Sequence, residues 1–318
     1  MRAPRAVAVA AALVAIGLAP PLAAEGPATL AFDHHATWHT FWRSDRAPAR
    51  WSGPDSMLSR SLVWKRLARG ADWSSVRLAC AAPVWRARLI VARLDPRDVA
   101  LSLVMDLSRD EGRPAWTIGR APHDAILAVN AGQFIRTMPW GWVAMDGRQR
   151  LRPGFGPLSS AVAVDASGRV RWAHGDSLLD ATGVAAGFQS YPTLLEGNGV
   201  VPAMLRTPNH LVSLTHHDAR LALGQTWDGR LLIVMTRFDA MGEEAGGFPL
   251  GPTTPEMAAI MGALGASDAV MLDGGISAQL LLREASGGKP LRWPGVRKVP
   301  LALIARPRVA PPAARASK

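Results

Sequence analysis

The strongest constraint on the fold is a series of short apolar segments that are joined in pairs by tight turns. The turns contain Asp-Gly or a similar polar and glycine pair, which is the chemistry of a β-hairpin. Three hairpins are expected, with strands at 142–144 and just after Asp146-Gly147, at 161–164 and 170–172, and at 221–224 and 231–235. Hairpins place consecutive strands antiparallel, so the sequence predicts largely antiparallel sheet.

One helix is specified among these strands. Apolar residues within 257–264 recur at i, i+3, i+4 and i+7, which is the spacing of an apolar helix face. Thr253 with Glu256 would form a capping box, or Thr254 would cap a helix that begins at Pro255. A few packed helices among mixed, largely antiparallel sheets correspond to an α+β fold.

The N-terminus has the features of a secretory signal peptide. Arg2 and Arg5 precede an uninterrupted run of small and apolar residues at 6–19, and Leu-Ala-Ala at 22–24 is a plausible cleavage site. The run is short for a membrane span, which favours cleavage over an uncleaved anchor. We expect residues 1–24 to be removed and the mature protein to be periplasmic or secreted, without a stable membrane span.

The rest of the chain shows no sharp domain boundary. Residues 25–83 form a Trp-rich N-terminal segment, residues 84–304 a strand-rich domain, and residues 305–318 a tail of Pro, Ala and basic residues that is expected to be disordered. Exposed tryptophans could stack on sugars, but packing is the favoured interpretation of the Trp-rich segment. Cys80 is the only cysteine, and its apolar neighbours are typical of a core thiol.

The charge of the chain favours acidic ligands over nucleic acid. The formal net charge is +11, but the arginines are scattered and do not alternate with aromatic residues in a basic block. A positive field still favours anionic substrates such as phosphodiesters or acidic glycans. The spacing of the histidines, carboxylates and single cysteine indicates no metal site, and no cofactor is expected.

Two apolar strands, far apart in the sequence, end in polar segments that contain glycine. Residues 269–272 lead into Asp-Gly-Gly at 273–275, and residues 125–129 lead into Asn-Ala-Gly at 130–132. Glycine lets the backbone turn sharply and lets a ligand come close to it. Two strand ends of this kind suggest one polar site that is built from several loops.

Four segments carry a resemblance to a known family. They read Asn-Ala-Gly-Gln-Phe at 130–134, Gln-Ser-Tyr-Pro-Thr-Leu-Leu at 189–195, Asp-Ala-Arg-Leu-Ala-Leu-Gly at 218–224 and Leu-Asp-Gly-Gly-Ile-Ser at 272–277. In their order and composition they resemble motifs of the phosphodiester glycosidase family, whose founding member removes N-acetylglucosamine from a phosphodiester on mannose. The chain departs from the family pattern at Ala131 and Ile276, where glycines are usual, and at 236–239, where an Asp-Gly-Arg is replaced.

The resemblance implies an exported hydrolase that cleaves a glycosyl phosphodiester, or a related glycosidic bond, in an anionic envelope or exopolysaccharide glycan. Its implied catalytic residues are Asp273, Asn130 and Arg220. On this interpretation Arg220 binds the phosphate, Asp273 acts at the sugar, and Asn130 with Gln189 orients hydroxyl groups. The further implied substrate-binding residues are Gln189, Gly132, Gly274, Gly275, Ser277, His217 and Arg237.

Other interpretations stay open from the sequence. Asp273 could only stabilise its Gly-Gly turn, and Arg220 could pair with Asp218 on the surface of a hairpin. A hydrolase could instead attack phosphorus and be a phosphodiesterase. The protein could also bind anionic polysaccharide of the cell envelope without catalysis.

Overall fold

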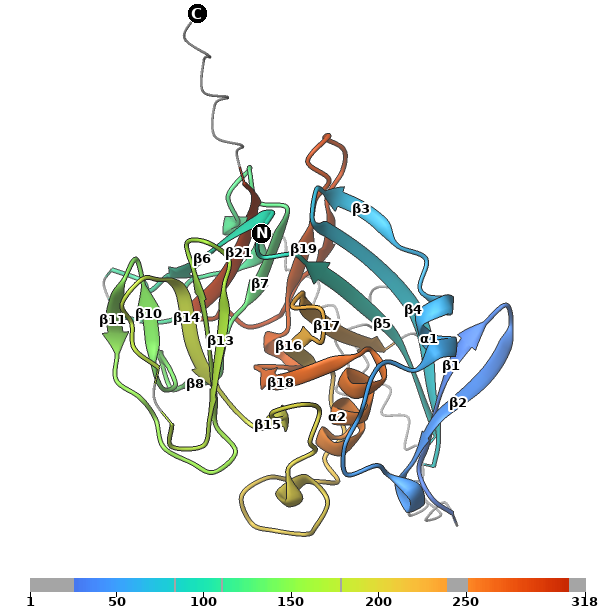
Figure 1. Ribbon diagram of the computed structural model, residues 1–318. Coiled ribbons are helices and arrows are strands. Elements are labelled where there is room, and N and C mark those ends of the chain that lie inside the picture. The colour runs from blue at the N-terminus through green and yellow to red at the C-terminus, as the bar shows by residue number, and fades with distance from the viewer. Residues whose placement is uncertain (1–25, 83, 110, 178, 239–250, 309–318) are drawn as a thin grey trace, which may run out of the picture.

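The computed structural model describes residues 26–82, 84–109, 111–177, 179–238 and 251–308 (Figure 1). These residues form a nine-stranded sheet, two five-stranded sheets and a two-stranded hairpin. Every pairing between the named strands is antiparallel, as the turns predict. The expected signal peptide, residues 1–24, lies outside the described residues.

The nine-stranded sheet has the order β15-β18-β16-β17-β5-β4-β1-β2, with β3 paired to β4. Its strands are β1 (Thr29–His34), β2 (Thr37–Arg43), β3 (Lys65–Ala68), β4 (Ala71–Ala81), β5 (Val84–Leu94), β15 (Thr193–Leu195), β16 (Leu221–Thr226), β17 (Leu231–Phe238) and β18 (Ala266–Leu272). The Trp-rich segment therefore contributes β1 to β4 to the same sheet as strands of the strand-rich domain.

The two five-stranded sheets have the orders β11-β10-β14-β12-β13 and β20-β19-β7-β21-β6. The strands of the first are β10 (Val143–Met145), β11 (Arg148–Leu151), β12 (Ser160–Asp165), β13 (Val170–His174) and β14 (Val184–Ser190). Those of the second are β6 (Val99–Met105), β7 (Leu127–Asn130), β19 (Leu280–Leu282), β20 (Leu291–Trp293) and β21 (Leu301–Pro307). The separate hairpin joins β8 (Phe134–Ile135) to β9 (Met138–Pro139).

The three predicted hairpins are confirmed as β10–β11, β12–β13 and β16–β17. In the first of them, Asp146 has φ +53° and Gly147 has φ +70°. Two consecutive left-handed residues define the turn type that matches the twist of the paired strands. The local sequence is therefore sufficient to specify these strand pairs.

Helices are few in the described residues, so the α+β class holds only in the coarse sense of antiparallel sheets with little helix. The α-helices are α1 (Ser56–Ser61) and α2 (Thr254–Ala263), and short 3-10 turns occupy Ser44–Arg46, Ile118–Arg120, Ala203–Leu205 and Gly275–Ser277. The capping box is present: Thr253 Oγ1 accepts from the Glu256 amide, and Glu256 accepts from the Thr253 amide. Helix α2 is buried on nearly all sides rather than on one face, because it lies inside a core.

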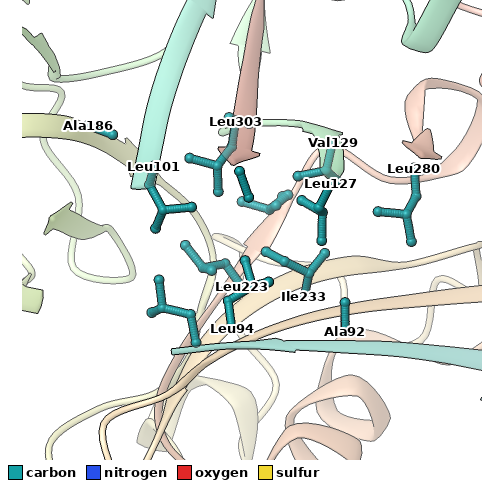
Figure 2. Close-up of a cluster of buried hydrophobic side chains, with 14 of the residues drawn as sticks. Ala92, Leu94, Leu101, Leu127, Val129, Ala186, Leu223, Ile233, Leu280 and Leu303 are labelled. Carbon is teal, nitrogen blue, oxygen red and sulfur yellow. The ribbon is translucent and has the colours of Figure 1, made fainter. Parts of the chain in front are cut away.

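The nine-stranded sheet separates two hydrophobic cores. In β5, Ile90 and Ala92 face a core shared with both five-stranded sheets, whereas Leu89 and Val91 face a core shared with α1 and α2. Figure 2 shows part of the first core, where Leu94 and Ile233 lie opposite Leu101 and Leu303. The central strands are apolar on both faces for this reason.

The structure also bears on the expectations for Cys80, the tryptophans, the C-terminal tail and a membrane span. Cys80 is buried in the core, and burial, the main cause, raises the pKa of its thiol to about 11. Trp42 is buried, in agreement with a packing role, whereas Trp38 is exposed. Strand β21 continues to Pro307, past the expected start of the tail at residue 305, and residues 309–318 lie outside the described residues. Among the described residues, no helix has the length and apolar character needed to cross a membrane.

Candidate active site

The ends of strands from different sheets meet at one place. Strand β7 of a five-stranded sheet ends at Asn130, and β18 of the nine-stranded sheet ends at Leu272. Leu272 pairs with Leu221 at the start of β16, which brings Arg220 beside the residues that follow β18. The Asp273 amide donates to the Gly132 carbonyl at 3.0 Å, and the Gly275 amide donates to Ala219 at 2.7 Å. These bonds fix three of the four motif segments against one another.

The buried side chain of Asn130 bonds to two backbone groups where these strand ends meet. Its side-chain Nδ2 donates to the Asp273 carbonyl at 2.8 Å, and its Oδ1 accepts from the Gln279 amide at 3.0 Å. The side chain is 1% exposed and is not part of the cavity wall described below. Asn130 therefore holds both ends of the connection from β18 to β19 and positions Asp273.

Asp273 presents a largely buried carboxylate. Its Oδ2 atom has no hydrogen-bond partner among the described residues. Burial raises the pKa of Asp273, and the neighbouring Asp218 carboxylate adds to that rise, whereas a hydrogen bond with Ser277 and the charge of Arg297 oppose it. A buried, incompletely satisfied carboxylate is costly for stability and is typical of functional sites.

Arg220 lies beside Asp273 with its guanidinium held by backbone carbonyls. Nε donates to the Pro252 carbonyl at 2.9 Å, and Nη2 donates to the His216 carbonyl. Burial lowers the pKa of Arg220, and the carboxylates of Asp218 and Glu256 act in the opposite direction. Arginine remains charged even so, so the site keeps a fixed, partly desolvated cation.

A cavity of about 240 Å³ joins these groups. Its wall includes the charged and polar side chains of Asp273, Arg220, Asp218, His216, Gln133, Ser213 and Thr254. Two carboxylates, one guanidinium and one imidazole therefore face the same space. Such a set can bind an anion and can also exchange a proton with a substrate or a water molecule.

The three predicted glycines explain how the segments fit together. A Cβ at Gly274 would lie 2.5 Å from the Ala219 carbonyl oxygen, and one at Gly275 would lie 2.7 Å from Asp218 Oδ2. Gly275 and Gly132 also have left-handed φ values of +53° and +67°. Gly274 thus permits a close approach of the Ala219 backbone and also forms part of the cavity wall, whereas Gly275 makes room for the Asp218 carboxylate and Gly132 lies close to the Gln189 carbonyl.

Three other predicted residues point away from this cavity. The Gln189 amide accepts from the Trp142 and Gly154 amides and donates to the Gly154 carbonyl, so it ties two loops together. His217 bonds to the Gly251 carbonyl and lines a separate cavity of about 490 Å³. Arg237 is buried and donates to the Pro294 carbonyl at 2.6 Å. Ser277, by contrast, lies behind Asp273 and bonds to it.

Asp218, His216 and Gln133 also line the cavity, although their place in the sequence did not assign them to the site. Asp218 stands two residues before Arg220 in a motif segment, but was interpreted only as a possible surface partner of that arginine. His216 and His217 are adjacent, and only the structure shows that His216 is the one that faces the cavity. Gln133 follows Gly132 in its motif, which was the available signal.

The described residues contain no group of three histidine, cysteine or carboxylate side chains arranged to hold a metal ion. Arg220, Asp218 and Asp273 are the arginine and the carboxylates that line the cavity described above.

Solved structures of other proteins share the fold of this chain. The chain is similar to the zebrafish N-acetylglucosamine-1-phosphodiester alpha-N-acetylglucosaminidase catalytic domain, a structure auto-inhibited by its pro-peptide, with 13% identity and a TM-score of 0.54 over 83% of this chain and 99% of that one. It is also similar to a protein of Burkholderia pseudomallei K96243 that is named as exported, with 15% identity and a TM-score of 0.53 over 82% of this chain and 100% of that one.

A hypothetical protein from Synechocystis matches with 15% identity and a TM-score of 0.48, and this chain covers 64% of its length. No curated protein matches the sequence. The sequence model of the phosphodiester glycosidases matches residues 123–306, a range that contains Asn130, Arg220 and Asp273. Because this match spans more than half of the chain, the protein belongs to the phosphodiester glycosidase family.

Proposed function

We propose that the protein hydrolyses a glycosyl phosphodiester, with Asp273 and Arg220 as its central catalytic groups. The observation that carries the proposal is that a carboxylate with a raised pKa and a partly buried guanidinium line one cavity. Membership of the phosphodiester glycosidase family supports a hydrolase of this class.

Arg220 suits the phosphate. Its guanidinium plane is fixed by the bonds to the Pro252 and His216 carbonyls, and among the described residues no carboxylate forms a salt bridge with it. Its positive charge is therefore available to a ligand in the cavity. A fixed cation stabilises negative charge as it develops on the departing phosphate, at little cost of reorganisation.

Asp273 suits the sugar carbon. When the bond from the anomeric carbon to the phosphate oxygen breaks, its electron pair leaves with the phosphate monoester and positive charge develops at that carbon. A water molecule adds to the carbon, and its proton passes to the Asp273 carboxylate and then to solvent. The products are the free sugar and the phosphate monoester. Because burial raises the pKa of Asp273, its ionised form is a stronger base than an exposed aspartate.

The proposed setting is outside the cytoplasm, on an anionic envelope or exopolysaccharide glycan. Support comes from the signal-like residues 1–24, from a net charge that stays at +9 without Arg2 and Arg5 (11 − 2 = 9), and from the fold shared with a Burkholderia protein that is named as exported. Mass spectrometry of the protein from the cell envelope tests the export step, and an intact Met1 in that fraction would contradict it.

The activity is tested with a panel of sugar-1-phosphodiesters and the variant Asp273→Asn. We expect kcat to fall on the order of a hundredfold or more, with KM changed less, because the amide keeps the shape but loses the charge and the basicity. In the wild type, kcat should fall as the pH drops through the pKa of Asp273, which lies above 3.8. Asp146→Asn, at a side chain that is 81% exposed, is the matched control.

Three outcomes would redirect the proposal. Full activity in folded Asp273→Asn would mean that this carboxylate only stabilises its turn. Hydrolysis in ¹⁸O-labelled water separates the chemistries, because label in the sugar requires attack at carbon, whereas label in the phosphate requires attack at phosphorus. Binding of anionic polysaccharide without turnover of any diester would favour the non-catalytic alternative.

A further inference from the structure

A second, apolar cavity adjoins the candidate active site. It has a volume of about 190 Å³, and Pro192 and Val212 belong to the walls of both cavities. Gln133, in the wall of the charged cavity, also donates to the backbone carbonyl of Tyr191 in the wall of the apolar one. The two spaces are therefore neighbours that share part of one wall.

Aromatic and aliphatic side chains dominate this second cavity. Trp140 and Tyr191 form an edge-to-face pair with ring centroids 4.8 Å apart, and Phe155 and Leu211 complete the rim. Phe155 is 75% exposed, Leu211 45% and Tyr191 39%. Single exposed apolar residues are ordinary, but a cluster around a cavity beside a polar site indicates a surface that a ligand covers.

The polar character of this cavity is low. Among the described residues, no charged side chain lines it. The hydroxyl of Ser159, one of its few polar side chains, is already donated to the Gly175 carbonyl at 2.7 Å. A sugar ring needs hydrogen-bond partners for several hydroxyl groups, and burying them without partners is costly. An alkyl or aryl group has no such requirement.

A phosphodiester carries two ester groups, or arms, on its phosphate, here the sugar and the aglycone. Two neighbouring cavities could therefore each hold one of them. With the phosphate at Arg220 and the sugar carbon at Asp273, the second arm must leave the charged cavity. The apolar cavity lies next to it, across Pro192 and Val212. We infer that the apolar cavity binds the aglycone arm of the substrate and that this aglycone is an alkyl or aryl group rather than a second sugar. This inference rests on the proposed function and narrows its substrate class.

The first test compares methyl, butyl, benzyl and mannosyl diesters of N-acetylglucosamine-1-phosphate and of glucose-1-phosphate. Each methylene that enters the cavity should raise kcat/KM up to about fourfold, so butyl should exceed methyl by about tenfold or more. Phe155→Ala and Leu211→Ala should remove most of that gain on the butyl ester and leave the methyl ester nearly unchanged. Val296→Ala, at an 81% exposed side chain outside this cavity, is the control.

A second test separates this inference from the proposed function. Calorimetry measures binding of butyl phosphate and methyl phosphate to the wild type and to Phe155→Ala, and needs no turnover. Tighter binding of butyl phosphate that is lost in Phe155→Ala supports the apolar site even if no diester is hydrolysed. Equal kcat/KM for methyl and butyl esters, a preference for the mannosyl ester, or equal binding of the two phosphates would overturn it while the hydrolase activity stood.

Discussion

At the scale of the residue, Arg220 has a structural role in the fold and a proposed chemical role in the cavity. Two of its nitrogens donate to the carbonyls of Pro252 and His216, and its charge faces the cavity that contains Asp273. Lysine keeps the charge but presents it as a single point on a flexible chain, so it cannot reproduce the planar arrangement.

We therefore predict that Arg220→Lys lowers kcat/KM for a sugar phosphodiester by roughly tenfold or more, despite the retained charge. The lost carbonyl contact should also lower the free energy of unfolding by about 1–3 kcal/mol. Steady-state kinetics and a denaturant titration of the same preparation measure both effects. Arg66→Lys, at an 80% exposed side chain, should change neither. Wild-type kinetics in Arg220→Lys would remove the phosphate-binding role.

Asp273 should make the protein less stable near neutral pH than an amide at the same place. Burial raises its folded pKa above 3.8, so the folded state binds the proton more tightly than the unfolded state does. The free energy of unfolding therefore falls as the pH rises from the unfolded pKa through the folded pKa.

Accordingly, Asp273→Asn should raise the melting temperature at pH 7, and this advantage should shrink as the pH falls toward 3.8. Thermal melts of the variant and of Asp146→Asn across that pH range provide the measurement and its control. A gain that stays constant with pH would show that ionisation of Asp273 is not its cause. A buried charged side chain that lowers stability in this way is common at functional sites.

At the scale of the element, the connection from β18 to β19 is the decisive piece of local structure. It leaves the nine-stranded sheet at Leu272 and enters a five-stranded sheet at Leu280. Asn130, at the end of β7, holds both ends of it through the Asp273 carbonyl and the Gln279 amide. The side-chain amide of Asn130 thus positions Asp273 and its carboxylate, although Asn130 itself does not line the charged cavity.

We predict that Asn130→Ala lowers the free energy of unfolding by about 2–4 kcal/mol, because two buried backbone groups lose their partners. It should also lower kcat, since the Asp273 turn is no longer fixed. Denaturant titration and kinetics measure the two effects. Asn130→Asp retains an acceptor for Gln279 but sets a buried carboxylate against the Asp273 carbonyl, so at neutral pH it should be at least as destabilised as the alanine variant. Unchanged stability in both variants would show that the Asn130 side chain does not hold the connection from β18 to β19.

The sequence is informative wherever an element is specified by its neighbours along the chain. The Asp146-Gly147 hairpin and the Thr253–Glu256 capping box were predictable because their bonds span a few residues. The orientation of Gln189 and the separation of His216 from His217 were not, because contacts with distant loops decide them. Helix α1 was missed as well, since six residues carry too little periodicity to show a helix face.

The same distinction applies to the candidate site. The motif segments predicted Asp273, Arg220 and Asn130 as site residues, and the structure places Asp273 and Arg220 in one cavity wall with Asn130 bonded to the Asp273 backbone. It could not be seen from the sequence that Asn130 would lie behind the cavity or that Asp218 would share it. Those facts depend on how β7, β16 and β18 meet, which is a property of the three sheets together.

At the scale of the whole molecule, the charge should influence encounter with the substrate. The net charge of +11, or +9 once Arg2 and Arg5 leave with the expected signal peptide (11 − 2 = 9), produces a positive field that would attract the proposed phosphodiester, and salt screens this field. We predict that raising the salt concentration from about 20 to about 200 mM lowers kcat/KM severalfold while kcat at saturation changes little. Equal responses to sodium chloride and choline chloride would identify screening as the cause, whereas an insensitive kcat/KM would exclude steering.

The sheet topology also means that strands made early in synthesis must wait for late strands before they can pair. Strand β5 is completed by β17, which follows it by more than a hundred residues, and β7, the strand that carries Asn130, is flanked by β19 and β21 near the end of the chain. Contacts between such distant segments form slowly and leave strand edges open in the meantime. The chain therefore cannot complete its charged cavity until nearly all of it has been made. We therefore expect a polypeptide with this topology to lack a complete cavity for as long as its last strands are withheld.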